Sequence, residues 1–256
     1  GFKKYETDIL IKSHLADYLL FKLIAKLFVR IFKINMFEIE IYIRAKKIVN
    51  RLRGFDVVQL INENSFKTSP LFEIKLLKQI FQNNNKVFLL SCGVDSVSLK
   101  HAMSKKLKYS ILTPLFENAS LEKKYEPILK YEKENYLALA KFVQEYVNGI
   151  ISSDLDYHIP YLSKKKYLGM IPNPINTQKI KYYGINKSKK ILILHAVNSS
   201  NKIKKGNKFF EEALGIIGKK FKDKISIITT YDLPYKEHLE NLKNCDILLD
   251  MVYAYD

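Results

Sequence analysis

The stretch that decides the fold is Lys189 to Leu214, which reads KKILILHAVNSSNKIKKGNKFFEEAL. It opens with the apolar run Ile191–Leu194, whose length and β-branched content are typical of a buried parallel strand. We expect a polar loop from His195 to Lys204, and apolar residues at helical spacing predict a helix over 206–221. A strand, a loop ending in a cation and a glycine, and then a helix start is an arrangement that binds phosphate in many α/β proteins.

Spacing alone leaves two interpretations of this stretch open. In the first, Lys205 and the backbone N–H groups of the helix start meet an anion, and Gly206 lets the backbone come close. In the second, it is an ordinary turn between a strand and a helix on a lysine-rich surface. The stretch lacks the second glycine and the Ser/Thr of a P-loop, and it is not a GxGxxG fingerprint.

Three motifs in order resemble one family. HAVNSSNKIKKGNKFFEEAL is followed by CDILLDMVYAYD, and YLGMIPNPINTQKI precedes both. Together they resemble the GT-B-fold glycosyltransferases of the family 4-like group, in which an "IPNPI" connector is followed by a Lys-Gly loop, a helix and an "ADIxLDQ" strand. The resemblance covers residues 149–256 well and the first 148 residues loosely.

The resemblance implies an α/β fold with two Rossmann-like domains, the C-terminal one incomplete. Residues 1–172 would form the acceptor domain with its first β-α-β unit missing, 173–188 the interdomain connector, and 189–256 part of the nucleotide-sugar-binding domain. In the family, a glycine-containing loop and a helix with a ribose-binding glutamate follow the point at which this sequence ends. We therefore expect both ends of the enzyme to be missing.

The resemblance further implies an activity. A sugar would pass from a nucleotide-sugar donor to a saccharide or lipid-linked acceptor, as in the synthesis of surface polysaccharides and glycoconjugates. No metal or other cofactor is expected, because cationic side chains and a helix N-terminus would neutralise the leaving diphosphate. The catalytic residues remain unknown.

Donor-side residues follow from the motif match. Lys205 corresponds to the family's Lys-Gly lysine and would bind the donor phosphate, while Gly206 and Asn207 would supply N–H groups. The family often has an arginine earlier in this loop, so Lys202 or Lys204 would replace it. Tyr253 and Asp256 would lie at the start of the loop that binds the donor. His195 either lines the cleft or packs in the interior.

The N-terminal half predicts a parallel sheet of its own. Strands over 56–61 (DVVQLI) and 86–91 (KVFLLS) flank an amphipathic helix over 70–82, which is a βαβ unit. Ligands of such sheets bind beyond the carboxyl ends of the strands. The acceptor-side candidates are therefore Asn62, Glu63, Gly93 and Asp95. Plain turn chemistry is the alternative explanation of these four residues.

Further elements are expected along the chain. They are helices over 39–52, 125–146 and 234–244, and strands over 149–153, 167–171, 225–230 and 246–250. Tyr157 and His158 are expected in a loop, and Pro172 ends the last strand of the first domain.

A basic, strongly apolar helix is predicted over 17–34, DYLLFKLIAKLFVRIFKI. Its cations Lys22, Lys26, Arg30 and Lys33 fall on one narrow stripe. The helix either packs on the sheet with this stripe in water, or lies on an anionic membrane surface that the cations contact. The cations make it a poor transmembrane span.

Composition narrows the choice of partners. The chain of 256 residues has a formal net charge of +17, but its cations are almost all lysine, whereas arginine is favoured for nucleic-acid readout. We therefore expect no nucleic-acid partner. Cys92 and Cys245 are isolated, which fits a reducing cytoplasm, with attachment at the inner membrane face as an option.

Two other function classes stay open. One is a basic membrane- or partner-binding α/β module without catalysis, which would bind no nucleotide. The other is a different nucleotide-sugar enzyme such as an epimerase, which would bind the nucleotide but transfer no sugar to an acceptor.

Overall fold

The computed structural model describes residues 18–32, 36–178 and 190–254, which divide into two compact units. The first unit comprises Gly1–Lys100 and Ile128–Pro172, and the second comprises His101–Pro127 and Asn173–Asp256. The sequence predicts residues 101–127 within the first domain, whereas in the structure they pack with the second unit. Most of the predicted connector lies outside the described residues, which resume at Lys190.

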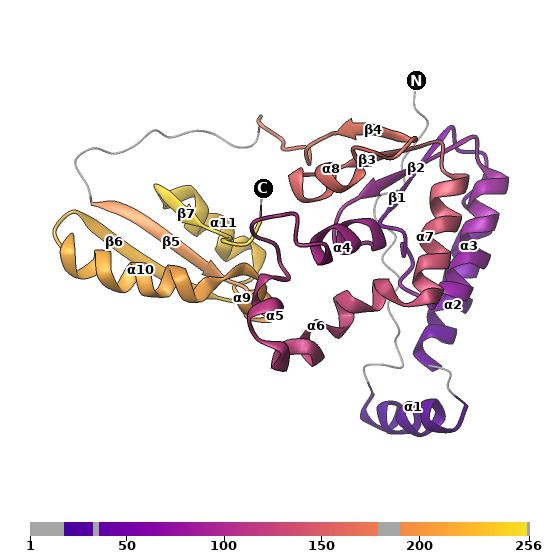
Figure 1. Cartoon of the computed structure of the whole chain (residues 1–256), viewed down its shortest axis with the longest axis horizontal. Helices are drawn as coiled ribbons and strands as arrows, with labels where there is room; N and C mark the ends of the chain where they lie inside the picture. The colour runs from indigo at the N-terminus through magenta and orange to yellow at the C-terminus, as the bar shows by residue number, and fades with distance from the viewer. Residues whose placement is uncertain (1–17, 33–35, 179–189, 255–256) are drawn as a thin grey trace. The chain divides into compact units, whose positions relative to one another are not determined.

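The first unit is built on a parallel sheet whose strands follow one another in chain order (Figure 1). The strands are β1 (Val57–Ile61), β2 (Lys86–Ser91), β3 (Gly149–Ser152) and β4 (Tyr167–Met170). Leu60 pairs with Leu89, and Leu89 with Ile150, so the register is continuous across three strands. Because all strands run in one direction, the residues that follow β1, β2 and β3 meet at the same edge.

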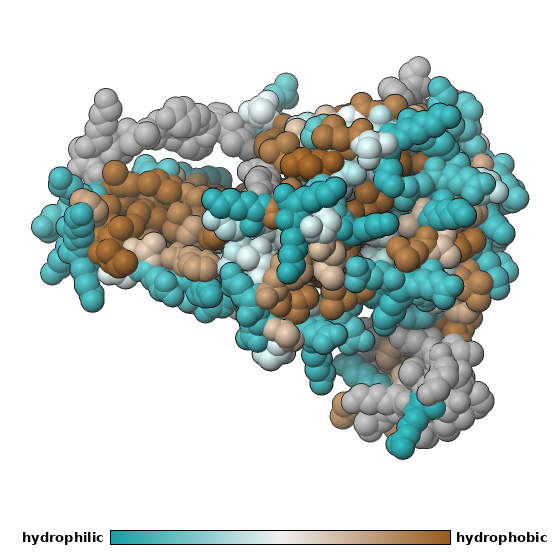
Figure 2. All heavy atoms as spheres, viewed as in Figure 1, coloured by the Kyte–Doolittle hydropathy of each residue, from teal (hydrophilic) through white to brown (hydrophobic). Residues whose placement is uncertain are grey.

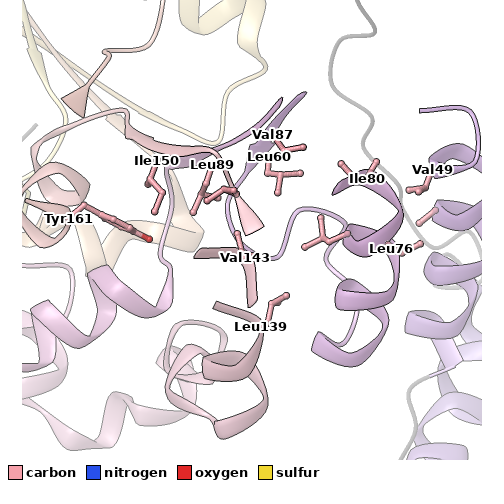
Figure 3. Packing of buried hydrophobic residues seen from close by; sticks show 13 residues of the cluster. Val49, Leu60, Leu76, Ile80, Val87, Leu89, Leu139, Val143, Ile150 and Tyr161 are labelled. Carbon is pink, nitrogen blue, oxygen red and sulfur yellow. The ribbon is translucent and has the colours of Figure 1, made fainter. Parts of the chain in front are cut away.

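One face of this sheet is buried by helices that carry apolar residues at helical spacing. The helices of this unit include α1 (Leu19–Phe32), α2 (Met36–Val49), α3 (Pro70–Asn83), the first part of α4 (Ser96–Met103), α7 (Glu134–Tyr146) and α8 (Leu155–Tyr161). Figure 3 shows side chains from β1, β2 and β3 lying among those of α2, α3 and α7. Leu77 on α3 and Leu139 and Val143 on α7 are fully buried. The apolar sides of these two helices therefore hold them against the sheet.

The helical prediction over 125–146 is wrong in its continuity. The structure has α6 (Glu122–Leu129), a 3-10 turn, and then α7. Lys133 has an extended backbone with φ −67° and ψ 143°, which starts α7 anew. Two short helices, α4 and α8, are not among the predicted elements, and Tyr157 and His158 lie in α8 rather than in a loop.

The second unit contains a three-stranded parallel sheet in the order β6-β5-β7. Its elements are α5 (Thr113–Glu117), β5 (Ile191–Val197), α9 (Lys202–Lys205), α10 (Asn207–Lys220), β6 (Ile225–Tyr231), α11 (Tyr235–Asn244) and β7 (Ile247–Leu249). From β5 the chain moves to one side for β6 and to the other side for β7. This reversal makes the carboxyl end of β5 a topological switch point, where ligands of α/β sheets bind.

Apolar residues are also exposed on this second sheet. Ile191 on β5, Ile228 on β6 and Ile247 on β7 are 43%, 37% and 45% exposed, and Figure 2 shows the apolar surface over β5 and β6. Both sheets are parallel and carry helices, so the chain is a mixed α/β protein, as predicted. None of the helices described is both long and apolar enough to cross a membrane.

Candidate functional site

The carboxyl edge of the first sheet brings together the four acceptor-side candidates, Asn62, Glu63, Gly93 and Asp95. Asn62 has a left-handed backbone with φ 68°, and its Nδ2 donates to the carbonyl oxygens of Cys92 at 3.3 Å and Val94 at 2.9 Å. Gly93 lies between them at φ 69°, a conformation that favours glycine. The loop after β2 is thus held by the residue that follows β1.

Glu63 is a buried carboxylate that is only half satisfied. It is 1% exposed, and its Oε1 accepts from the backbone N–H and the hydroxyl of Ser96, at 3.0 and 2.6 Å. Its Oε2 is buried and has no hydrogen-bond partner among the described residues. Burial, followed by the negative charge of Asp95, raises the pKa of Glu63 from 4.5 to about 8. The Glu63 carboxyl group therefore holds its proton at neutral pH.

Asp95, in contrast, is fully bonded. Its Oδ1 accepts from the backbone N–H of Ser98 at 2.7 Å, at the start of α4. Its Oδ2 accepts from Ser91 Oγ at 2.6 Å and from Tyr161 Oη at 2.9 Å. These bonds fix Asp95 in the interior and occupy both of its carboxylate oxygens.

Sequence reasoning missed Asp154, which follows β3 as Asp95 follows β2. Its Oδ2 accepts from Ser153 Oγ at 2.6 Å, while its Oδ1 is buried without a partner among the described residues. Tyr157 lies beside it, and burial followed by the charges of Asp154 and Asp95 raises the pKa of Tyr157 well above its usual value. The rule applied to β1 and β2, which selects polar residues after a parallel strand, would have identified Asp154.

A second hydrogen-bonded set continues this polar region toward β4. Tyr167 Oη lies 2.5 Å from Ser152 Oγ and 2.6 Å from His158 Nδ1. The rings of Tyr161 and Tyr167 are 5.9 Å apart between centroids. No sequence signal could have identified this set, because its members come from β3, α8 and β4 and meet only through the fold.

The edge of the first sheet is therefore acidic, with a carboxylate after each of β1, β2 and β3. Over the described ranges, no three or more His, Cys, Asp or Glu side chains are grouped as a metal site would require. The arrangement offers oxygen acceptors to a ligand.

The switch point of the second sheet is basic. Lys205 forms an ion pair with Asp250, which follows β7, and their side chains are 24% and 57% exposed. Lys202 pairs with Glu211 at 2.8 Å, and Lys204 forms no ion pair with any residue that the structure describes. Because exposed pairs of this kind contribute only about 0–1 kcal/mol, an anionic ligand can compete for these lysines.

The loop before Lys205 is more structured than predicted, and this alters the expected donor groups. Strand β5 continues to Val197, and α9 occupies the end of the predicted loop. Gly206, at φ 72°, joins α9 to α10, and its N–H donates to the carbonyl of Ile203 at 3.1 Å. The expectation that this N–H faces a phosphate is thus not met, because the turn ending α9 uses it.

Asn207 and His195 bind each other in the interior. Both are fully buried, and the Asn207 amide nitrogen lies 2.9 Å from His195 Nε2. Burial lowers the pKa of His195, so it is neutral near pH 7. Of the two alternatives left open for His195, the structure has the packed histidine. Asn207 Oδ1 and His195 Nδ1 are buried and have no hydrogen-bond partner among the described residues.

Tyr253 packs against the turn that precedes α10. It is 3% exposed and packs against Gly206, since a Cβ on that glycine would lie 3.0 Å from the tyrosine ring. Tyr109 from the 101–127 segment and Phe209 from α10 pack against it at centroid distances of 6.4 and 5.8 Å. Burial raises the pKa of Tyr253.

The remaining predicted site residues are only partly described. Asp256, Lys33 and the side chain of Lys26 lie outside what the structure describes. Lys22 and Arg30 are exposed on α1. No protein-family model matches this chain, and no curated protein matches it.

Proposed function

We propose that the chain is a glycosyltransferase of GT-B architecture, which moves a sugar from a nucleotide-sugar donor to a saccharide or lipid-linked acceptor. The observation that carries the proposal is the position of Lys205 at the switch point of the second sheet, with Lys202 and Lys204 on the same short helix.

The basic switch point suits a diphosphate. A leaving nucleoside diphosphate develops negative charge, and preorganised cations stabilise that charge without a metal. Since the N–H of Gly206 is bonded within its own turn, the lysine side chains would supply this stabilisation. Lys205 would exchange Asp250 for the phosphate.

The acidic edge of the first sheet supports the second half of the reaction. An acceptor hydroxyl needs oxygen groups that orient it, and Glu63 and Asp154 each present a buried carboxylate oxygen without a partner among the described residues. A basic site for the anionic donor and an acidic site for a hydroxyl-bearing acceptor match the two substrates of a glycosyltransferase.

A thermal-shift panel of UDP, GDP, ADP and CMP tests the proposal. A ligand at ten times its dissociation constant stabilises by about 1.4 kcal/mol, which raises the midpoint by roughly 2–4 °C. We expect one nucleotide to produce this shift with the wild type and not with Lys205→Ala. The matched control is Lys219→Ala, which removes the same charge from the other end of α10.

Either of two results would count against the proposal. One is the absence of a shift with every nucleotide in protein that melts cooperatively. The other is an equal shift with Lys205→Ala, which would place any nucleotide elsewhere.

A second property, attachment to an anionic membrane, is favoured by α1. Its Leu19 and Leu20 are 74% and 66% exposed, and the same helix carries the exposed Lys22 in its first turns and the exposed Arg30 in its last turn. Apolar residues and cations on one short helix fit the boundary of a bilayer with anionic lipids. We propose that this helix holds the enzyme on the membrane that carries a lipid-linked acceptor.

Flotation with vesicles tests this attachment. The wild type should float with vesicles containing phosphatidylserine and less with phosphatidylcholine alone, and Leu19→Glu should abolish flotation. Leu137→Glu, an exposed leucine on α7, is the control. Equal flotation of Leu19→Glu would exclude α1 as the contact.

A further inference from the structure

We infer that Asp250 is an internal competitor for the anion that binds Lys205, so that this carboxylate limits the affinity of the switch point of the second sheet. The inference rests on the proposed function only in so far as that anion is the diphosphate of the donor. It goes beyond that function because it gives Asp250 an inhibitory role and predicts that removing its charge improves binding.

The ion pair between Lys205 and Asp250 lies at the surface, where a dissolved anion can reach it. Lys205 Nζ meets Asp250 Oδ1, and the two side chains are 24% and 57% exposed. Ion pairs this exposed are weak, because water and salt screen the attraction and because ordering two side chains costs entropy. The Asp250 carboxylate and an incoming anion therefore compete for the same ammonium group.

The segment that carries Asp250 is anchored to the turn after Lys205 by contacts other than the ion pair. The N–H of Val252 donates to the carbonyl oxygen of Lys205 at 2.9 Å. Val252 and Tyr253 pack on Gly206, where an added Cβ would lie 3.0 Å from each. Asp250 is thus kept near Lys205 even after an anion has displaced it, and its negative charge then repels the bound anion.

A second ion pair of the same kind starts α9. Lys202 pairs with Glu211 of α10 at 2.8 Å, and the two side chains are 42% and 35% exposed. Residues three apart on a helix are neighbours on its surface, so Lys202 and Lys205 lie on one side of α9. Each of these two cations already has a carboxylate partner within the protein. An anion with two linked charged groups can replace both carboxylates at once, whereas a single phosphate replaces one.

Removing the charge of Asp250 should raise the affinity of this site for anions. Even in water, two unit charges about 4 Å apart interact strongly enough to change an equilibrium constant roughly fivefold. Asp250→Asn keeps the size and shape of the side chain, so the variant loses both the competition and the repulsion while the anchored segment stays in place. We expect it to bind an anion at Lys205 about fivefold more tightly than the wild type, or better.

Isothermal titration calorimetry of the full chain with inorganic pyrophosphate, at constant pH and salt, tests this role. Pyrophosphate has two linked phosphates and no nucleoside, so the titration does not depend on which base the site accepts. Asp250→Asn should bind pyrophosphate about fivefold more tightly than the wild type, or better, and adding Lys205→Ala to this variant should abolish the binding.

The matched control is Asp223→Asn. Asp223 is exposed in the turn between α10 and β6, so this variant removes the same charge elsewhere in the second unit and should leave the affinity unchanged. Asp250→Ser, a second substitution that removes the charge, should bind pyrophosphate more tightly than the wild type, as Asp250→Asn does.

Three results would overturn the inference. The first is equal or weaker pyrophosphate binding by Asp250→Asn, which would make Asp250 a residue that positions Lys205. The second is an equal gain from Asp223→Asn, and the third is tight binding that survives Lys205→Ala. A Lys205-dependent nucleotide shift without a gain from Asp250→Asn would overturn this inference alone, whereas the gain without any nucleotide shift would overturn the proposed function alone.

Discussion

Replacing Glu63 with glutamine should change the pH dependence of stability more than stability at low pH. Burial and Asp95 raise the pKa of Glu63 from 4.5 to about 8, so between these values the folded state holds a proton that the unfolded state has lost. This contribution to stability is fully present below pH 4.5 and is lost as the pH rises through 8. One pKa unit corresponds to about 1.4 kcal/mol, so the loss between about pH 5 and pH 8 is on the order of 3 kcal/mol.

Urea unfolding measures this effect, followed by circular dichroism because the chain has no tryptophan. Glutamine does not titrate, so the variant lacks this loss. The free energy of unfolding of Glu63→Gln should therefore rise relative to that of the wild type by a few kcal/mol as the pH is raised from about 5 to about 8. A difference between variant and wild type that stays constant with pH would refute the reasoning.

The same change at Glu73 gives a second test of this reasoning. Glu73 accepts from the backbone N–H of Phe66 at 2.7 Å, from Thr68 Oγ1 at 2.9 Å and from Asn64 Nδ2 at 3.3 Å. Burial nevertheless raises its pKa from 4.5 to about 7, so the free energy of unfolding of Glu73→Gln should rise relative to the wild type only between about pH 5 and about pH 7. A larger rise with Glu73→Gln than with Glu63→Gln would count against the larger pKa shift of Glu63.

Three further changes have expected outcomes. Gly206→Ala should destabilise the second unit by about 1–3 kcal/mol in urea unfolding, because φ is 72° and the added Cβ would lie 3.0 Å from Tyr253. Gly93→Ala should cost only about 1 kcal/mol, because its added Cβ would have nothing within 4 Å. Tyr161→Phe removes the 2.9 Å bond to Asp95 Oδ2 and should cost about 1–3 kcal/mol by the same measurement. Leu77→Ala should cost about 2–5 kcal/mol, since Leu77 is fully buried in the core. No change in stability for Tyr161→Phe or Leu77→Ala would show that the packing described for the first unit is wrong.

Much of the fold could be predicted because its strands are short apolar runs between polar turns. Parallel strands form at all three of the predicted runs DVVQLI, KVFLLS and ILIL. The amphipathic patterns over α3 and α10 likewise predicted helices that the structure contains. Local pattern fails where an element is shorter than two helical turns, as in α8, which also contains Pro160. It fails as well where a long charged pattern is interrupted, as at Lys133.

Only those site residues that follow directly from the order and direction of the strands could be predicted. The rule that parallel strands end at one edge selected Glu63 and Asp95, which the structure places on neighbouring loops. It could not predict that Tyr161 reaches Asp95, because that contact depends on how α8 packs against the sheet. Nor could local pattern predict that Asn207 pairs with His195 in the interior, since a buried polar pair and a ligand-binding pair have the same sequence.

In the proposed function the two substrates are divided between two sites: the basic switch point of the second sheet binds the nucleotide, and the acidic edge of the first sheet binds the acceptor. Line broadening of the ³¹P resonances of UDP, GDP, ADP and CMP on titration with protein tests it most directly. We predict broadening for at least one nucleotide with the wild type and with Glu63→Gln, and none with Lys205→Ala. Equal broadening with Lys205→Ala, or its loss with Glu63→Gln in folded protein, would contradict this division.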